Sequence, residues 1–298
     1  MKKIIILLVL SISCMTLASC GKQKPDENNV TFAGLEVIEE DGLKYVYYGN
    51  YPQTIVNDSQ IIAALSKLAV FNEQGYLEYN QQEYAVITTS DKQTQYFLVE
   101  PIKWLYLGIK DDAYQLITAA IIDQQEYIEE DNFTIIDHSY NIKPGVPAGT
   151  YANNYQYSDL REWLNNDFYL NAFVKSDKSI IVKTNVDNSA NTTGHTPNPY
   201  ACANTDDYVL TLSAREASTI NGTAKPTDYA KAEGCDVFTY SAEDANSEKY
   251  VGNGYWWTRS PNYFYPYSAS GINYNGLLYN YINAYYLGIG VRPVINIK

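Results

Sequence analysis

Residues 255–294 read YWWTRSPNYFYPYSASGINYNGLLYNYINAYYLGIGVRPV, and this stretch is the most informative part of the chain. Tyrosines are interleaved there with asparagines and serines, and glycines divide the run into short strands joined by turns. Tyrosine offers a large, rigid contact area at low entropic cost, while asparagine, serine and glycine form adaptable hydrogen bonds. The composition is that of an antibody combining site, so it predicts a surface that binds a partner.

The predicted binding face is centred on 262–286. Its candidate ligand-binding residues are Asn262, Tyr263, Phe264, Tyr265, Tyr267, Ser268, Asn273, Tyr274, Asn275, Tyr279, Asn280, Tyr281, Asn283, Tyr285 and Tyr286. Tyrosine alone does not distinguish such a face from an ordinary β-rich end, because the chain contains 30 tyrosines.

Lys, Glu, Gln, Met and Trp are missing from 258–297. An AAC or AAT codon cannot become any of these types when only its adenines change. The same codons can become Asn, Tyr, Phe, Ser, Ile, Gly, Leu, Ala or Pro, which fill the segment. Asp is also reachable and yet absent, and Gln is already missing after Gln156, so the pattern favours adenine-directed variation without requiring it.

Upstream of this stretch, hydrophobic spacing predicts three helices. The clearest begins at Ser158, and its apolar face consists of Leu160, Trp163, Leu164 and Phe168. Acidic residues in its first turn suit the positive end of the helix dipole. A second helix is expected to be capped by Ser59, and a short third one to follow Ser213 around 215–217.

Strands are expected in several short runs of aromatic and β-branched residues. They are 45–51, ending at a turn before Pro52; 84–88 paired with 96–99; 102–107 paired with 114–122 through a turn at 108–112; and 208–212. The segment 187–199 is expected to be a long loop, and 221–245 is expected to be loop-rich. Strands and helices mix without βαβ alternation, which is typical of an α+β fold.

The N-terminus has the build of a bacterial secretory signal. Lys2 and Lys3 precede an apolar run at 4–12 that is shorter than the roughly 20 residues needed to span a bilayer. Residues 17–20, Leu-Ala-Ser-Cys, resemble the bacterial lipobox, which implies cleavage after Ser19 and lipidation of Cys20. We therefore expect a signal peptide at 1–19, a lipidated flexible tether at 20–33 and one domain at 34–298. The alternative is an ordinary secretory signal that is cut elsewhere.

Charge and motifs exclude several functions. A formal net charge of −13 argues against nucleic acid or anionic lipid as the main partner. The two histidines, His138 and His195, do not belong to any metal-ligand motif, and no phosphate loop, dinucleotide fingerprint or nucleophile elbow is present. We expect neither an enzyme nor a cofactor or metal site; acidic loops could hold structural calcium, but no ordered loop motif supports it. A disulfide between Cys202 and Cys235 stays open.

Several motifs resemble a family of bacterial secreted proteins and lipoproteins with the C-type lectin fold, in the branch that includes formylglycine-generating enzyme. The motifs are Gly-Asn-Tyr-Pro-Gln at 49–53, Pro-Ile-Lys-Trp at 101–104, Leu-Arg-Glu-Trp-Leu-Asn at 160–165, Trp-Trp-x-Arg-Ser-Pro at 256–261 and Gly-Val-Arg-Pro at 290–293. The oxidase activity is not implied, because that enzyme uses two closely spaced cysteines and the last sixty residues contain none.

Some members of that family resemble the variable proteins of diversity-generating retroelements, whose ligand-binding face is rewritten by adenine-directed mutagenesis. This resemblance implies a variable region at 258–291 held by a fixed scaffold. The scaffold residues would be Trp256, Trp257, Arg259, Gly290, Val291, Arg292 and Pro293. From packing alone, the two tryptophans are expected in the core and the two arginines are expected to bond within the fold.

The resulting hypothesis is a ligand-binding lipoprotein of the cell envelope, anchored by lipid outside the cytoplasmic membrane and exposed at the cell surface. Its partner is expected to be a protein or another cell-surface ligand, and not a nucleic acid. The alternatives are a lipoprotein with a fixed glycan-binding or glycan-processing site, and an envelope structural protein without a dedicated ligand.

Overall fold

The computed structural model describes residues 35–88, 92–134, 136–240 and 245–298. Strands predominate there and the helices do not alternate with them, so the predicted α+β class is confirmed. No helix of these residues is long and apolar enough to span a membrane. The predicted signal peptide at 1–19, Cys20 and the tether at 20–33 lie outside the described residues.

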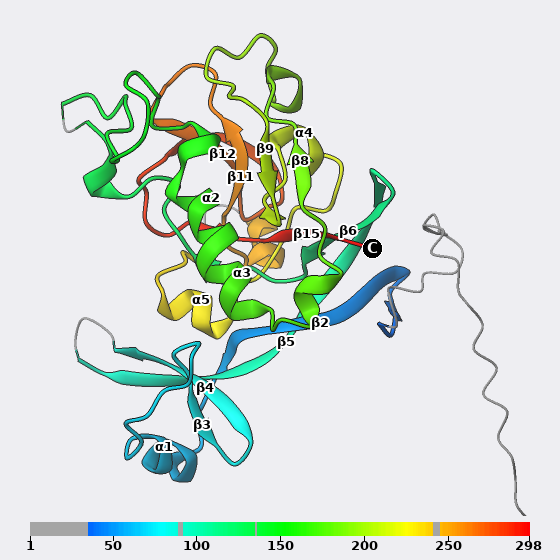
Figure 1. Ribbon diagram of the computed structural model, residues 1–298, viewed down its shortest axis with the longest axis vertical. Coiled ribbons are helices and arrows are strands. Elements are labelled where there is room, and N and C mark those ends of the chain that lie inside the picture. Colours follow the sequence, from blue (N-terminus) through cyan, green and yellow to red (C-terminus); the bar gives the residue numbers. More distant parts are fainter. Residues whose placement is uncertain (1–34, 89–91, 135, 241–244) are drawn as a thin grey trace, which may run out of the picture.

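The larger sheet is built on two long antiparallel strands, β2 (Leu43–Ile55) and β5 (Thr94–Lys110). Its order is β1-β2-β5-β6-β15-β10, and β4 also pairs with β5 and carries β3. The other strands are β1 (Ile38–Glu40), β3 (Leu77–Tyr79), β4 (Gln82–Thr88), β6 (Ala113–Thr118), β10 (Val209–Leu210) and β15 (Val294–Ile297). Figure 1 shows β2 and β5 running from the body of the molecule into a corner formed by β3, β4 and α1 (Ser59–Leu65).

The smaller sheet contains most of the tyrosine-rich stretch. Its order is β13-β12-β11-β14-β7, so β13 is an edge strand, and β14 runs parallel to β11. The strands are β7 (Asp123–Gln124), β11 (Trp256–Pro261), β12 (Ser268–Ile272), β13 (Leu278–Asn283) and β14 (Gly290–Val291). A separate pair joins β8 (Thr184–Val186) to β9 (Thr205–Asp207).

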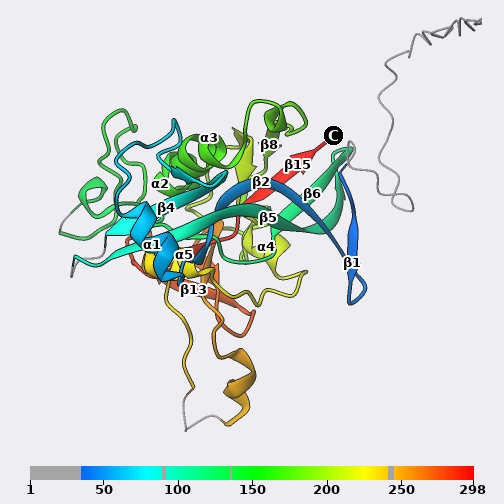
Figure 2. The same cartoon turned by 90° about the horizontal axis from the view of Figure 1, so that it is seen from below.

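The helices are short. The α-helices after α1 are α2 (Asp159–Trp163), α3 (Tyr169–Ala172), α4 (Ala214–Ala217) and α5 (Asp228–Ala232), and η3 (Leu164–Phe168) is a π-helical turn. The 3-10 turns are η1 (Glu130–Asn132), η2 (Tyr155–Tyr157), η4 (Asp177–Ser179), η5 (Ala190–Thr192) and η6 (Ala245–Tyr250). In Figure 2, α2 and α3 lie on one side of the long strands and β13 lies on the other.

The predicted helix at Ser158 is confirmed as the continuous run α2-η3-α3. The Ser158 hydroxyl accepts a hydrogen bond from the Arg161 backbone N–H at 3.1 Å, which satisfies one of the free donors of the first turn. Leu160, Leu164 and Phe168 are completely buried. Their apolar face therefore anchors the helix to the core.

One cluster of buried side chains joins the two sheets. It contains Trp104 of the larger sheet, Trp257 and Ile282 of the smaller sheet, and Phe168 of the helical run. Trp256, although adjacent to Trp257, packs in a second cluster with Ile272 and Val294, because successive side chains of a strand point to opposite faces. The described residues therefore form a single domain, and both tryptophans lie in the core as predicted.

The expected strand end at Pro52 is wrong. β2 continues to Ile55, and Pro52 lies opposite Val99 beside a register shift in the pairing of β2 with β5. Proline cannot donate to a ladder, and the irregular pairing after it accommodates the missing donor. The first hairpin pair, 84–88 with 96–99, is confirmed within β4 and β5.

The turn of the second expected pair is shorter than 108–112. Lys110 already pairs with Ala113, and Asp111 and Asp112 form the turn with φ values of 51° and 58°. Aspartate tolerates this left-handed conformation, which two-residue hairpins require. Gly108 instead lies at a bulge within β5.

Two helix predictions need correction. α1 is present, but its cap is Asp58 and not Ser59, since the Asp58 carboxylate accepts from the N–H groups of Gln60 and Ile61. The segment 221–245, expected to be loop-rich, also contains the helix α5, which the sequence did not predict and which Thr227 caps. The short helix expected after Ser213 is confirmed as α4. The Ser213 hydroxyl caps it by accepting from the Glu216 N–H, and the Ser213 backbone N–H donates to the Glu216 carboxylate. Cys202 and Cys235 are both free, so the disulfide left open by the sequence is not formed.

Candidate functional site

Exposed and half-buried aromatic rings gather on β13 and on the connection from β11 to β12, together with one tyrosine just before β11 and one after β13. We call this surface the aromatic face; it consists of Tyr255, Tyr263, Phe264, Tyr265, Tyr267, Tyr279, Tyr281 and Tyr286. Phe264, Tyr265 and Tyr281 are each 45–50% exposed, and what distinguishes them from other exposed rings of the chain is that they adjoin one another. The ring centroids of Phe264 and Tyr281 lie 6.3 Å apart, and the Tyr281 centroid lies 6.4 Å from those of both Tyr265 and Tyr279. The rings therefore form one continuous surface.

Strand alternation explains why β13 contributes to this surface. Tyr279 and Tyr281 point outward, while Ile282 is buried in the cluster that joins the two sheets. β13 is the edge strand of the smaller sheet, so the backbone groups on its outer side are not paired with another strand of that sheet.

Buried amides shape the loop that carries Phe264 and Tyr265. Asn262, a predicted ligand-binding residue, is only 1% exposed, and its side-chain oxygen accepts from the N–H groups of Phe264 (2.6 Å) and Tyr265 (2.9 Å). Its amide nitrogen donates to the Asn280 carbonyl of β13. Asn153, which the sequence did not single out, donates to the carbonyls of Tyr265 and Ser268 from across the fold. Asn262 is therefore a buried residue that holds the backbone of Phe264 and Tyr265 in place.

The other predicted polar residues lie within or beside the hairpin of β12 and β13. Ser268 is buried and bonds to Asn283, and the Ser270 hydroxyl bonds to Asn280. The side chains of Asn273 and Asn275 accept from the Leu277 N–H and hold the turn between these strands. All of these side chains are buried or half-buried. They order the backbone beneath the exposed rings.

Two predicted tyrosines lie in separate aromatic clusters. Tyr274 stacks on Phe238 with ring centroids 3.8 Å apart, and it also contacts Tyr255 at 5.8 Å. Tyr285 packs against Phe133 at 4.7 Å, and its hydroxyl lies 3.1 Å from Nδ1 of His138. Tyr274 thus adjoins the aromatic face through Tyr255, whereas Tyr285 belongs to a neighbouring group.

A hollow of about 330 Å³ opens in the aromatic face. Its lining consists of Asp236, Tyr255, Tyr279, Tyr281, Ile282, Asn283, Tyr286 and Ile289. The Tyr286 hydroxyl donates to the Asp236 carboxylate at 3.0 Å, and this bond raises the pKa of Tyr286. Burial raises the pKa of Tyr255 as well. Tyr255 opens the tyrosine-rich stretch but was not among the candidate ligand-binding residues. Asp236 was not indicated at all, because it comes from a loop-rich segment with no motif.

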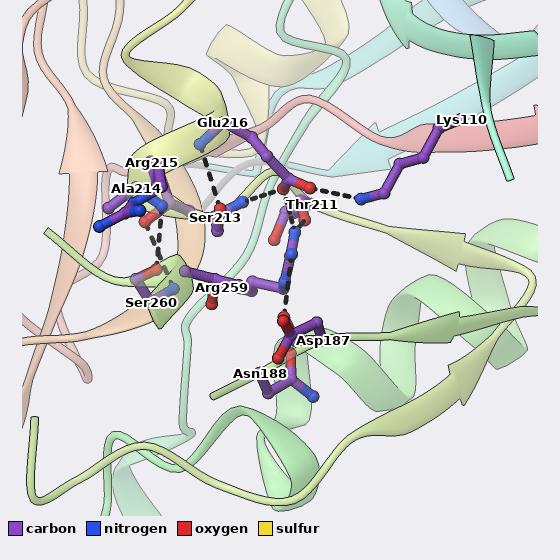
Figure 3. A network of polar contacts seen from close by, with 12 residues as sticks. Lys110, Asp187, Asn188, Thr211, Ser213, Ala214, Arg215, Glu216, Arg259 and Ser260 are labelled. Atoms are coloured by element: carbon purple, nitrogen blue, oxygen red, sulfur yellow. Dashed lines mark hydrogen bonds and ion pairs between the residues drawn. The ribbon is translucent and has the colours of Figure 1, made fainter. Parts of the chain in front are cut away.

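The predicted scaffold residues lie inside the fold. Figure 3 shows the Arg259 guanidinium donating to the Thr211 carbonyl (2.8 Å), the Asp187 carbonyl (3.1 Å) and the Glu216 carboxylate (2.6 Å). Burial alone would raise the pKa of Glu216, but Arg259 and Lys110 together hold it well below its usual range. Arg259 therefore joins β11 to α4, and its predicted bonding within the fold is confirmed.

Arg292 is buried in the same way at the other end of the stretch. Its Nε and Nη2 donate to the Thr118 carbonyl at 3.0 and 2.8 Å, and its guanidinium lies 5.1 Å from the Trp256 ring. Burial lowers the pKa of Arg292 to about 10. The part of the stretch between Arg259 and Arg292 is thus flanked on both sides by side chains that bond to the interior.

A second, acidic hollow of about 500 Å³ lies near the start of α2 and includes Glu126, Glu129, Asp159 and Trp163. Burial and the neighbouring carboxylates raise the pKa of Glu126 to about 7. The Lys143 ammonium neutralises part of the negative charge of this hollow, because it forms an ion pair with the Asp159 carboxylate at 2.5 Å. Within the described residues, no group of three or more His, Cys, Asp or Glu side chains could hold a metal ion.

Fold and site together define an α+β domain that presents an exposed aromatic surface at the edge of its smaller sheet. Residues 116–298, more than half of the chain, match the family described as Domain of unknown function (DUF6273), and the chain belongs to this family. The matched part contains the whole smaller sheet and the aromatic face, and it leaves out β1 to β5. No curated protein and no solved structure matches the chain.

Proposed function

We propose that this protein is a surface-tethered ligand-binding lipoprotein whose aromatic face binds a protein or another cell-surface ligand. The observation that carries the proposal is the contrast along the stretch 255–294. Its ends, including Trp257, Arg259 and Arg292, are buried, while the rings between them are exposed and contiguous. A folded domain leaves such rings in water at a cost, and a partner that covers them offsets it.

The chemistry of the face suits a broad contact. Tyrosine rings bury apolar area and retain a hydroxyl for hydrogen bonding, and aromatic residues are enriched where binding energy concentrates. The backbone beneath them is held by amides such as Asn262 and Asn153, so little order has to be gained on binding. A pre-organised surface of this kind favours a large partner over an enclosed small molecule.

The remaining parts of the proposal rest on the sequence. The fold is proposed to be C-type lectin-like, and Cys20 to carry the lipid that keeps the protein in the cell envelope, outside the cytoplasmic membrane. We also propose that a retroelement diversifies 258–291. The division between buried ends and exposed rings supports this, because variation at exposed side chains leaves the core intact.

Binding is tested with the full chain and two variants of matched exposure. Tyr265 and Tyr47 are both 45% exposed, but Tyr47 lies on β2, outside the aromatic face. We expect Tyr265→Ala together with Tyr281→Ala to reduce binding to bacterial or host cell surfaces at least tenfold, and Tyr47→Ala to leave it unchanged. Equal loss in both variants, or in neither, contradicts the proposal. Binding to single members of a glycan array, lost on the same substitutions, indicates the alternative of a fixed glycan site.

Diversification is tested in the gene. Sequencing the codons for 250–298 in a population of the producing bacterium should reveal substitutions confined to adenine positions of a nearby template copy, next to a reverse transcriptase gene. An invariant segment without a template copy contradicts diversification and leaves a binding protein with one fixed partner.

A further inference from the structure

The hollow in the aromatic face combines tyrosine rings with a carboxylate. Tyr255 and Tyr279 meet at 6.4 Å and 75°, and Tyr279 and Tyr281 at 6.4 Å and 73°. The planes of these neighbouring rings are therefore nearly perpendicular to each other. The rings line the hollow as walls instead of stacking flat. Aromatic walls of this kind attract cations, because the face of each ring carries the negative part of its quadrupole.

Asp236 lines this hollow and is held in place by two hydrogen bonds. The Asp236 backbone N–H donates to the Gly288 carbonyl at 2.8 Å, and the Asp236 carboxylate accepts from the Tyr286 hydroxyl. Gly288 has a φ of 110°, and a Cβ there would lie 2.5 Å from an Asp236 carboxylate oxygen. Only glycine permits this approach, so the backbone of the tyrosine-rich segment is adapted to Asp236.

The charge of Asp236 has no counter-ion within the described residues. No Lys, Arg or His among them lies within ion-pair distance of its carboxylate. The chain as a whole carries a formal charge of −13, which attracts positively charged partners. A cation that enters the hollow would meet a carboxylate with free acceptor positions and the faces of several rings.

We propose that this hollow binds an organic cation, namely the ammonium or guanidinium end of a Lys or Arg side chain on the partner. The inference rests on the proposed function, because it assigns the chemistry of the partner at the same face. A volume of about 330 Å³ lies at the small end of the range for ligand pockets, and it suits the end of one side chain. The apolar stem of Lys or Arg would pack along the tyrosine rings, as such stems do on apolar surfaces.

The test titrates the full chain, in nonionic detergent, with small probes followed by saturation-transfer NMR. The cationic probes are Nα-acetyl-lysine methylamide and Nα-acetyl-arginine methylamide, and the neutral match is Nα-acetyl-norleucine methylamide. We expect saturable binding of both cations and at least tenfold weaker binding of the neutral probe. Choline serves as a source of quaternary ammonium; if it binds while the lysine and arginine probes do not, the assignment to a basic side chain is overturned.

Variants separate this inference from the proposed function. Asp236→Asn keeps the size of the side chain and an acceptor for Tyr286, and it should weaken cation binding at least tenfold, as should Tyr279→Leu. Glu78→Gln, which removes an exposed carboxylate on β3, should change nothing. If Asp236→Asn binds the cations like the unaltered chain, the inference fails. If Tyr265→Ala with Tyr281→Ala abolishes cell-surface binding while Asp236→Asn does not, the proposed function stands without it.

Discussion

A single buried amide, Asn262, determines the shape of an exposed surface. Its side chain caps the backbone N–H groups of Phe264 and Tyr265 and reaches across to the Asn280 carbonyl of β13. These bonds tie the loop after β11 to the strand that carries Tyr279 and Tyr281. A residue can therefore be essential to a binding face without contacting the ligand.

This role predicts that Asn262 contributes mainly to stability. Asn262→Ala leaves two half-buried N–H groups and a half-buried carbonyl without the side chain that pairs with them, so it should lower the free energy of unfolding by about 2–3 kcal/mol. Tyr265→Ala, on the exposed side of the same loop, should change it by less than about 1 kcal/mol. Urea unfolding followed by circular dichroism measures both. Equal and small effects would place Asn262 among the contact residues instead.

Asp123 is a single residue that should make the stability of the fold depend on pH. The residue is 3% exposed in β7, and burial raises the pKa of its carboxyl to about 7 despite a hydrogen bond from the Tyr51 hydroxyl. Because the folded-state pKa lies above that of the unfolded chain, its contribution to stability is full below pH of about 4 and is lost as pH rises towards 7.

Replacing Asp123 with Asn should therefore remove part of this pH dependence. We expect the stability of the unaltered chain, relative to Asp123→Asn, to fall by up to about 1.4 kcal/mol per pH unit between pH about 4 and 7. Asp206→Asn, which changes an exposed carboxylate on β9, should leave the profile unchanged. A parallel profile for Asp123→Asn would show that Asp123 is ionised throughout.

At the scale of elements, the close approach of α3 to β2 depends on Gly49. A Cβ at this position would lie 2.6 Å from the Ala172 carbonyl oxygen and 2.7 Å from the Phe173 ring. Gly49→Ala should consequently destabilise the fold by about 2 kcal/mol or more, since both strain and overpacking oppose it. Gly42 has a similar φ of 76° but open space around it, so Gly42→Ala reports the backbone strain alone. Thermal unfolding of the two variants compares them, and equal losses would exclude a packing role for Gly49.

The contact between β11 and α4 depends on Arg259. Arg259→Met would leave Glu216 and the Thr211 carbonyl without their buried donor, and such losses cost about 3–5 kcal/mol. Arg215→Met alters an exposed arginine of α4 itself and should cost less than about 0.5 kcal/mol. Chemical denaturation distinguishes the two, and a mild effect of Arg259→Met would mean that the hydrophobic cluster around Trp256 holds α4 without it.

Elements with strong local signals could be predicted from the sequence. Ser158 and the apolar spacing after it specified a helix, and the adjacent Trp256 and Trp257 specified a buried strand. The strand end predicted at Pro52 was wrong because β2 continues past this residue through irregular pairing with β5. That pairing depends on residues far away in the chain. The hollow could be predicted only in part. Tyr279, Tyr281, Asn283 and Tyr286 were among the candidate residues, whereas Asp236 was not, because it lies 50 positions before Tyr286 and meets it only in the folded chain.

For the whole molecule, the proposed lipid anchor determines where the aromatic face can act. The resemblance of 17–20 to a lipobox predicts that Cys20 is acylated and becomes the first residue of the mature chain, and one lipidated residue with two or three acyl chains anchors stably. We expect the unaltered chain, produced in a bacterium, to enter the detergent phase on Triton X-114 partitioning and to begin at Cys20.

In the Cys20→Ser variant, mass spectrometry should find residues 1–19 still attached and no acyl chain, because cleavage at a lipobox requires the acylated cysteine. Cys14→Ser changes a cysteine inside the predicted signal and should partition like the unaltered chain. An unaltered chain that is cut elsewhere and stays in the aqueous phase would establish an ordinary secretory signal. The aromatic face would then belong to a released protein, and its binding would no longer benefit from the high local concentration that many tethered copies share at one surface.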